Sequence, residues 1–218
     1  MKSLSKDARN LSLSALIQHI QGQTCDTRFM VAIVGPPGSG KSTVAKQLQN
    51  MLNATVPEST AIVPMDGFHF DNAVLRERGR TAHKGAPDTF DVAALHMVLQ
   101  RLRTAFGGED IALPVFDRTL DLSRASARLV TKHTKILLVE GNYLLVDQPP
   151  WDTLRSFFAM TVMIDVDLDT IRERLLKRWT DLNFTQAQAI AKADNNDLPN
   201  ARFVLQNSAS PDFILSQD

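Results

Sequence analysis

The chain has 218 residues, of which 44% are hydrophobic, so it can bury one sizeable core as a single domain. Lys and Arg total 24, as do Asp and Glu, which leaves no net charge to attract nucleic acid or an anionic membrane. The single cysteine, Cys25, excludes an intramolecular disulfide and a cysteine-built zinc site, so we expect a reducing compartment, the cytoplasm. No apolar run approaches the length of a transmembrane helix. A small molecule is therefore the expected partner.

The N-terminal segment predicts a helix that lies on the main domain. Four apolar residues keep helical spacing: Leu13, Leu16, Ile17 and Ile20. An amphipathic membrane anchor is the alternative, but the polar face carries Ser and Gln rather than a row of Lys and Arg. We therefore divide the chain into an N-terminal helix with its linker, 1–28, and a main domain, 29–218.

A glycine-rich segment between a predicted strand and a predicted helix gives the strongest signal. Residues 29–34 are continuously apolar, as expected of a buried parallel strand, and residues 42–52 carry apolar side chains on one helical face. The eight residues that join them fit the phosphate-binding pattern G-x-x-x-x-G-K-S/T: Gly35, Pro36, Pro37, Gly38, Ser39, Gly40, Lys41 and Ser42.

This loop predicts binding of ATP with Mg²⁺. Glycines let backbone N–H groups close around phosphates, and the helix N-terminus adds its dipole. Lys41 supplies a positive charge at the outer phosphates, while Ser42 offers a hydroxyl to Mg²⁺, which prefers oxygen ligands. Thr43 is assigned to the same nucleotide site. An ordinary glycine-rich turn would need neither the Lys-Ser pair nor the flanking strand and helix.

A second apolar run, residues 61–65, ends in Asp66-Gly67-Phe68-His69. A carboxylate thus follows a strand at its carboxyl end, where ligands bind in open α/β sheets. Such a carboxylate can orient an acceptor hydroxyl and take its proton during phosphoryl transfer. Asp66 is our candidate base, with a turn-forming Asp before glycine as the alternative. Phe68 and His69 are assigned to the acceptor site beside it.

The next segment predicts a short helix at 72–78, a loop at 83–91 and then a longer helix with an apolar stripe. The loop carries His83 and Lys84. A basic loop near the phosphates suits an acceptor site, so Lys84 is a candidate contact. A solvated charge is the alternative.

Two further strands end in charged residues. Residues 111–116 predict a strand whose Pro114 favours a sheet edge, and Asp117 and Arg118 follow it as candidate acceptor contacts. Residues 135–139 are a third buried-strand signal and end in Glu140. Glu140 would hold Mg²⁺ directly or through water, unless it is merely a strand-end charge that reaches solvent.

The following segments predict a short helix at 151–158, another interior strand at 159–166 and a helix at 168–179. Arg174 and Arg178 lie one turn apart on that helix. Like charges at this spacing cost a few tenths of a kcal/mol, roughly, unless an anion is near. The pair therefore favours a lid over the phosphates, with a solvated basic face as the alternative.

The remaining residues predict a short helix at 185–193, a turn-rich stretch at 194–200 and a last strand at 202–205. These strings resemble the phosphoribulokinase, uridine kinase and bacterial pantothenate kinase group over most of residues 29–205. Residues 65–79 and 84–91 look like the pantothenate kinase version. The Asn-Asp-x-Pro-Asn segment that follows the lid helix is similar to bacterial kinases labelled as fructose-transport kinases.

The resemblance implies an α/β fold, the three-layer P-loop NTPase sandwich, with a mainly parallel sheet, helices on both faces and a helical lid. It implies Asp66 as acceptor base and Glu140 near Mg²⁺. Catalytic roles fall to Lys41 and to the lid residues Arg174 and Arg178. Three residues are placed near the nucleotide: Asn196, Pro199 and Asn200.

We expect a kinase that transfers the γ-phosphate of ATP to a hydroxyl of a small metabolite, with a sugar or sugar-like alcohol favoured. Where uridine kinases have Pro-x-Tyr-Asp, this chain has Pro114-Val115-Phe116-Asp117, so a nucleoside acceptor is disfavoured. Pantothenate kinases are considerably longer. Pantothenate- or nucleoside-type kinases, and a regulatory NTPase switch without an acceptor, remain as alternatives. A monomer and a homodimer are both open.

Overall fold

The computed structural model describes residues 8–23 and 26–216. Cys25 and part of the expected linker lie outside these ranges. The described strands and helices are, in chain order, β1 (Arg9–Asn10), α1 (Leu13–Gln21), β2 (Phe29–Val34), α2 (Lys41–Thr55), β3 (Thr60–Pro64), α3 (Asn72–Glu77), α4 (Val92–Thr104), β4 (Ile111–Asp117), β5 (Leu122–Val130), β6 (Ile136–Gly141), β7 (Met160–Asp165), α5 (Leu168–Asp181), α6 (Gln186–Lys192), α7 (Leu198–Asn207) and β8 (Phe213–Ser216).

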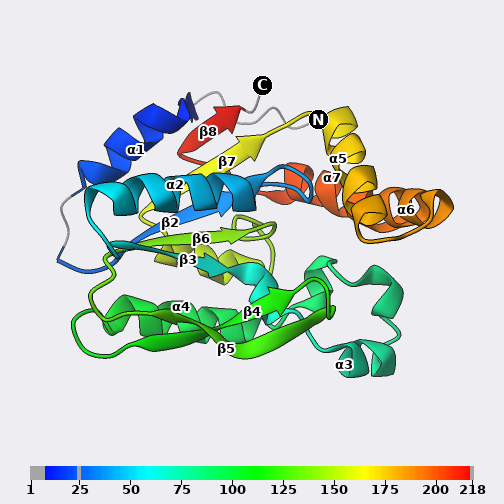
Figure 1. Ribbon diagram of the computed structural model, residues 1–218, viewed down its shortest axis with the longest axis horizontal. Coiled ribbons are helices and arrows are strands. Elements are labelled where there is room, and N and C mark those ends of the chain that lie inside the picture. Colours follow the sequence, from blue (N-terminus) through cyan, green and yellow to red (C-terminus); the bar gives the residue numbers. More distant parts are fainter. Residues whose placement is uncertain (1–7, 24–25, 217–218) are drawn as a thin grey trace.

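Six strands form one parallel sheet in the order β1-β8-β7-β2-β6-β3. Helices α1 and α2 cover one face, and α4 with the β4–β5 hairpin covers the other (Figure 1). Alternate residues of β2 enter the two cores, Ala32 on the α4 side and Ile33 on the α2 side. Because both faces are covered, every residue of β2 is buried. The expected parallel sheet with helices on both faces is confirmed.

The N-terminal helix packs as its apolar spacing predicts. Leu16, Ile17 and Ile20 of α1 are buried in the same core as Val44 and Leu48 of α2. Ser12 caps the helix, since its side chain accepts a hydrogen bond from the Ala15 N–H. In the described part of the chain, the helices are too short or too polar to span a bilayer.

Some sequence predictions need correction. Strand β4 has the edge position that Pro114 predicts, but it lies in a separate two-stranded sheet, where it pairs antiparallel with β5, a strand that the sequence did not predict. The predicted last strand at 202–205 lies inside α7, and the predicted turn is a π-helix, Ala193–Asp197, that continues into α7. The final strand is instead β8.

The register of the sheet brings the candidate catalytic residues together at the carboxyl ends of the strands. Glu140 at the end of β6 lies opposite Ile33 of β2 on one side and opposite Pro64 of β3 on the other. The phosphate loop follows β2, and a short 3-10 helix, Met65–Phe68, follows β3. Loop, Asp66 and Glu140 therefore meet at the carboxyl ends of three neighbouring strands.

Candidate active site

The phosphate loop has the backbone conformation that a polyphosphate requires. Gly38 and Gly40 have φ angles of +82° and +85°, in the left-handed region that favours glycine. Gly40 ends the loop directly before Lys41, so the free N–H groups of the first turn of α2 face it. Within the described residues, the Ser39 Oγ is buried without a hydrogen-bond partner. The loop thus fits the phosphates of ATP.

Lys41, Ser42 and Glu140 lie together beside the phosphate loop. The Ser42 hydroxyl donates to Glu140 Oε2 at 3.1 Å, which places two oxygen ligands of the kind Mg²⁺ prefers next to the loop. Burial lowers the pKa of Lys41, although the nearby Glu140 and Asp66 carboxylates oppose this. Burial also raises the pKa of Glu140, and Asp66 adds to the effect. A bound divalent cation would favour the ionised form of Glu140, so the residues fit the metal.

Asp66 lies opposite the loop and is paired with Arg118. Its Oδ2 accepts a hydrogen bond from Arg118 Nη2 at 2.8 Å. Burial raises the pKa of Asp66, but the positive charges around it outweigh burial and hold the pKa below its ordinary value, with His69 contributing most and Arg118 and Lys41 next. Asp66 is therefore ionised at neutral pH and able to accept a hydrogen bond from a hydroxyl.

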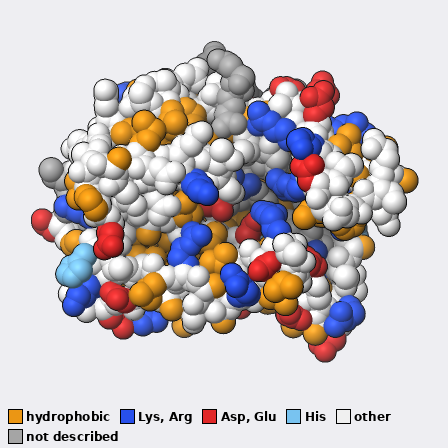
Figure 2. All heavy atoms as spheres, viewed as in Figure 1, with side chains coloured by type: hydrophobic (Ala, Val, Ile, Leu, Met, Phe, Trp, Pro, Cys, Tyr) orange, Lys and Arg blue, Asp and Glu red, His pale blue; other side chains and the backbone are white. Residues whose placement is uncertain are grey.

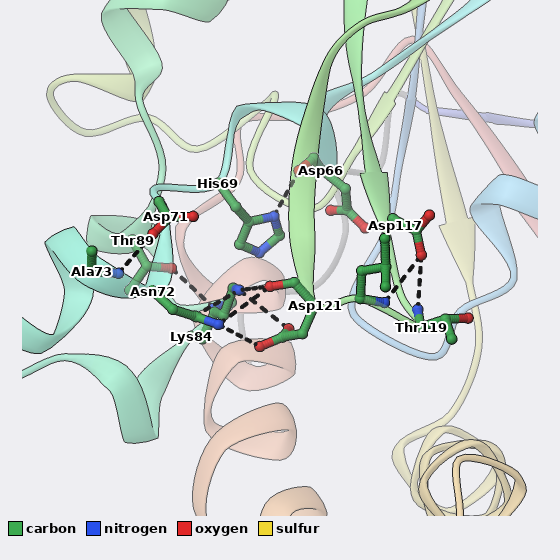
Figure 3. Close-up of polar contacts among 12 residues, drawn as sticks. Asp66, His69, Asp71, Asn72, Ala73, Lys84, Thr89, Asp117, Thr119 and Asp121 are labelled. Carbon is green, nitrogen blue, oxygen red and sulfur yellow. Dashed lines mark hydrogen bonds and ion pairs between the residues drawn. The ribbon is translucent and has the colours of Figure 1, made fainter.

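His69 supports the turn that carries Asp66. Its Nδ1 lies 2.7 Å from the Asp66 carbonyl oxygen (Figure 3). Its ring packs against Phe90 and Phe116, with ring centroids 4.0 and 4.7 Å away. Burial lowers the pKa of His69. A proton on Nδ1, donated to the Asp66 carbonyl oxygen, satisfies this arrangement.

Lys84 is held by the tip of the hairpin rather than solvated. Its Nζ donates to Asn72 Oδ1 at 2.8 Å and to the Asp121 carbonyl oxygen at 2.6 Å, and it lies 3.2 Å from the Asp121 carboxylate (Figure 3). The ammonium also lies over the Phe116 ring, 5.0 Å from its centroid. The Lys84 side chain is only 12% exposed.

The lid arginines take different positions. Arg174 Nη1 donates to the Ser39 carbonyl oxygen at 3.4 Å and so contacts the phosphate loop from α5. Arg178 lines the cavity, and burial lowers its pKa, with repulsion from Arg118 acting in the same direction. On the next residue of the helix, Trp179 Nε1 donates to Asp197 Oδ2 at 2.7 Å. This bond ties α5 to the π-helix.

One cavity of about 810 Å³ is lined by the phosphate loop, by the candidate base Asp66 and by the lid helix α5. Figure 2 shows Lys and Arg side chains gathered around the hollow between the lid and the lower part of the molecule. The predicted site residues that line it are Pro37, Gly38, Gly40, Lys41, Ser42, Thr43, Asp66, His69, Lys84, Arg118 and Arg178.

Other candidates lie outside this cavity. Phe68 is 5% exposed and belongs to the core under α4. Asp117 accepts hydrogen bonds from the backbone of the hairpin turn and pairs with Arg124 at 3.5 Å. Three residues line a second cavity, of about 610 Å³, between the 80–88 loop and α7: Asn196, Pro199 and Asn200. Their assignment to the nucleotide stays a prediction.

Several cavity residues received no site role from the sequence. Asn72 and Asp121 meet only because the hairpin folds over α3, so no local signal identifies them. Asn142 comes directly after β6, the strand that carries Glu140. Polar residues after the carboxyl ends of parallel strands are candidate ligand contacts, and the reasoning that identified Asp66 in this way would also have identified Asn142.

The fold and the site together define a P-loop kinase, with a phosphate loop on one side of a cavity and a carboxylate on the other. The chain belongs to the phosphoribulokinase/uridine kinase family, since the model described as "Phosphoribulokinase / Uridine kinase family" matches residues 30–190. It is accordingly an ATP-dependent small-molecule kinase that works with Mg²⁺.

Similar proteins carry several names. The chain is 34% identical to "Putative uridine kinase C227.14" of Schizosaccharomyces pombe over 87% of its own length and 83% of that protein. It is 31% identical to a pantothenate kinase of Nocardioides, where it spans about half, 53%, of the relative. The crystal structure of a "putative fructose transport system kinase" from Silicibacter sp. TM1040 superimposes with a TM-score of 0.86 at 35% identity, covering 96% of this chain and 100% of that one.

Proposed function

We propose that this kinase transfers the γ-phosphate of ATP to a hydroxyl of a compact polar metabolite, a sugar or sugar-like alcohol. One observation carries the proposal. Lys41 of the phosphate loop and the Asp66 carboxylate line the same cavity and influence each other's pKa, so a γ-phosphate and an acceptor hydroxyl would lie between them.

Each side chain has a distinct part in this reaction. Asp66 accepts a hydrogen bond from the acceptor hydroxyl. It takes the proton as the bond between the hydroxyl oxygen and the γ-phosphorus forms and the bond between that phosphorus and the departing ADP breaks. Lys41 and Arg178 stabilise the negative charge of the transferring phosphoryl group, and Arg174 holds the lid helix against the loop. Ser42 and Glu140 would hold Mg²⁺. When bound, the metal neutralises charge on the phosphates.

The acceptor side of the cavity favours a small hydroxylated compound. Phe116 offers no hydroxyl at the position where the resemblance to uridine kinases expects a tyrosine, and its ring packs against His69. Lys84 and Asp121, which are hydrogen-bonded to each other, also line the cavity and add polar groups to its wall. Pantothenate-like compounds rank second and nucleosides third, and names of relatives support both.

A regulatory NTPase without an acceptor is the rival from another class. Such a switch needs no carboxylate opposite the phosphate loop, and the Asp66–Arg118 pair argues against it. A monomer or homodimer in the cytoplasm stays our prediction.

The test is a metabolite screen that follows ADP release and identifies the phosphorylated product by mass. Sugars, sugar phosphates, pantothenate and nucleosides are compared at equal concentration with wild-type protein and Mg²⁺. We expect a phosphorylated sugar or sugar-like alcohol. A clear nucleoside preference would overturn the acceptor ranking, and ADP release that requires a protein partner would support the switch.

A further inference from the structure

Asn142 occupies the position between the phosphate loop and Asp66. Strand β6 lies between β2 and β3, and its Glu140 is opposite Ile33 of one and Pro64 of the other. Gly35, Asn142 and Asp66 follow within two residues of the ends of β2, β6 and β3. The Asn142 side chain lines the active-site cavity at this central place.

The carboxamide of Asn142 has an unmet hydrogen-bonding capacity. Asn142 is 8% exposed, and its Oδ1 is buried with no hydrogen-bond partner among the residues that the structure describes. The residues on either side of Asn142, Gly141 and Tyr143, are held by close packing and by a hydrogen bond. A Cβ on Gly141 would lie 2.5 Å from the Met65 Cβ, and the Tyr143 hydroxyl donates to the Gly85 carbonyl oxygen at 2.6 Å. A buried polar atom left unpaired is costly, so its retention in a cavity wall indicates a ligand.

The hydrogen-bonding properties of Asn142 Oδ1 indicate which chemical group can bind to it. An amide oxygen accepts hydrogen bonds, so it needs a donor, and the ionised phosphate oxygens of ATP are acceptors only. A hydroxyl both donates and accepts, and therefore suits both ends of the carboxamide. Asp66 already serves the hydroxyl that reacts.

We propose that Asn142 is a specificity-determining residue that binds a second hydroxyl of the acceptor, so that the substrate class is a polyhydroxylated compound rather than a simple alcohol. This inference rests on the proposed function. Asn142 accepts the hydrogen bond of the unreacting hydroxyl and thereby fixes the direction in which the reacting hydroxyl meets Asp66.

The test compares wild type with Asn142→Leu, which keeps the approximate volume and removes both polar atoms. The substrates are matched pairs, D-ribose with 2-deoxy-D-ribose and D-glucose with 2-deoxy-D-glucose, together with the best acceptor of the screen and its monodeoxy analogues. For each, KM and kcat for the acceptor, KM for ATP and the Mg²⁺ dependence are measured. The melting temperature of the ligand-free protein is recorded in parallel.

In Asn142→Leu we expect KM for the best acceptor to rise about tenfold or more, which corresponds to about 1.4 kcal/mol, with KM for ATP unchanged. The deoxy analogue that lacks the bound hydroxyl should lose nothing further in the variant. The melting temperature should stay level or rise, because an unpaired buried amide has been replaced by an apolar group.

Three outcomes would overturn the inference. A changed ATP KM or Mg²⁺ dependence with an unchanged acceptor KM would assign Asn142 to the nucleotide or to metal-bound water. A lower melting temperature with normal kinetics would make the residue structural. If wild type phosphorylates none of the compounds, the proposed function fails. Calorimetric binding of the same compounds to both proteins then tests Asn142 separately. The inference about Asn142 is wrong if none of the compounds binds.

Discussion

Arg118 and Asp66 are joined by an ion pair in which the guanidinium engages one oxygen of the carboxylate, Oδ2, at 2.8 Å. Arg118 comes from the tip of the β4–β5 hairpin and Asp66 from the 3-10 helix that follows β3, so the pair also connects the hairpin to the acceptor side of the cavity. The proposed base is therefore ionised and oriented by a residue from a different element.

The first prediction concerns Asp66 itself. Asp66→Asn should keep ATP affinity but lower phosphoryl transfer by about 100- to 10,000-fold, because an amide cannot take the proton of the acceptor. ATP binding is measured by calorimetry and transfer by product mass. The matched control is Asp152→Asn on the exposed surface, which should act as wild type. Equal transfer rates in wild type and Asp66→Asn would remove Asp66 from the mechanism.

The second prediction is a pH effect of Arg118. The positive charge of Arg118 helps to keep the pKa of Asp66 below its ordinary value, so Arg118→Gln should raise that pKa. Activity requires ionised Asp66, and the acidic limb of the kcat/KM profile should therefore move to higher pH. Arg103→Gln serves as the control for loss of one positive charge. An unmoved acidic limb in Arg118→Gln would show that the pair does not tune the base.

The third prediction separates the metal ligand from the base. Glu140→Gln removes the charge beside Ser42 and should raise the Mg²⁺ concentration for half-maximal activity by about 10- to 100-fold. Activity is titrated with Mg²⁺ at saturating ATP. Glu173→Gln, the same change on the exposed face of α5, should leave the titration unaltered. A normal Mg²⁺ curve in Glu140→Gln would mean that Glu140 is only a strand-end charge.

The fourth prediction tests the phosphate loop. Wild-type protein should gain about 2.7 kcal/mol of stability against unfolding when Mg-ATP is present at 100 times its Kd. Lys41→Ala should lose this gain and all activity while folding normally, because it removes the positive charge that we expect beside the outer phosphates in the cavity. Thermal unfolding with and without Mg-ATP measures both. No gain in the wild type would contradict the nucleotide site.

The fifth prediction concerns the turn that presents Asp66. A Cβ on Gly67 would fall on the Pro114 carbonyl of β4, so Gly67→Ala should lower the free energy of unfolding by about 1–3 kcal/mol. Gly108→Ala is the control, because its nearest neighbour to a new Cβ, the Ala105 carbonyl oxygen, lies 3.6 Å away. Denaturant unfolding of both variants decides the point, and equal midpoints would show that the turn can shift without cost.

Four of the six strands of the parallel sheet could be predicted, because burial on both faces gives a recognisable pattern, a continuous apolar run that stops at glycine or a carboxylate. Strands β2, β3, β6 and β7 all carry it. Strand β5 could not be predicted, because its Ser, Ala and Arg residues have no such pattern and its exposed strand exists only through pairing with β4.

The incorrect predictions of a turn at 194–200 and a strand at 202–205 have a similar cause. Polar residues at 194–200 suggested a turn, but their side chains bond to other parts of the chain instead of to their own backbone. Asp194 pairs with Arg172 at 2.9 Å, and the Asn196 amide donates to the Lys84 carbonyl oxygen. Tertiary partners thus let the helix continue through residues that usually end one.

The loop that carries Lys84 is anchored from behind through its main chain. The Asn196 amide binds the Lys84 carbonyl oxygen at 2.9 Å, and the Tyr143 hydroxyl binds that of Gly85 at 2.6 Å. Neither anchor depends on which side chain stands at position 84. A substitution there would therefore change the side chain presented to the cavity, and its contacts with Asn72 and Asp121, while these two main-chain anchors of the loop remain.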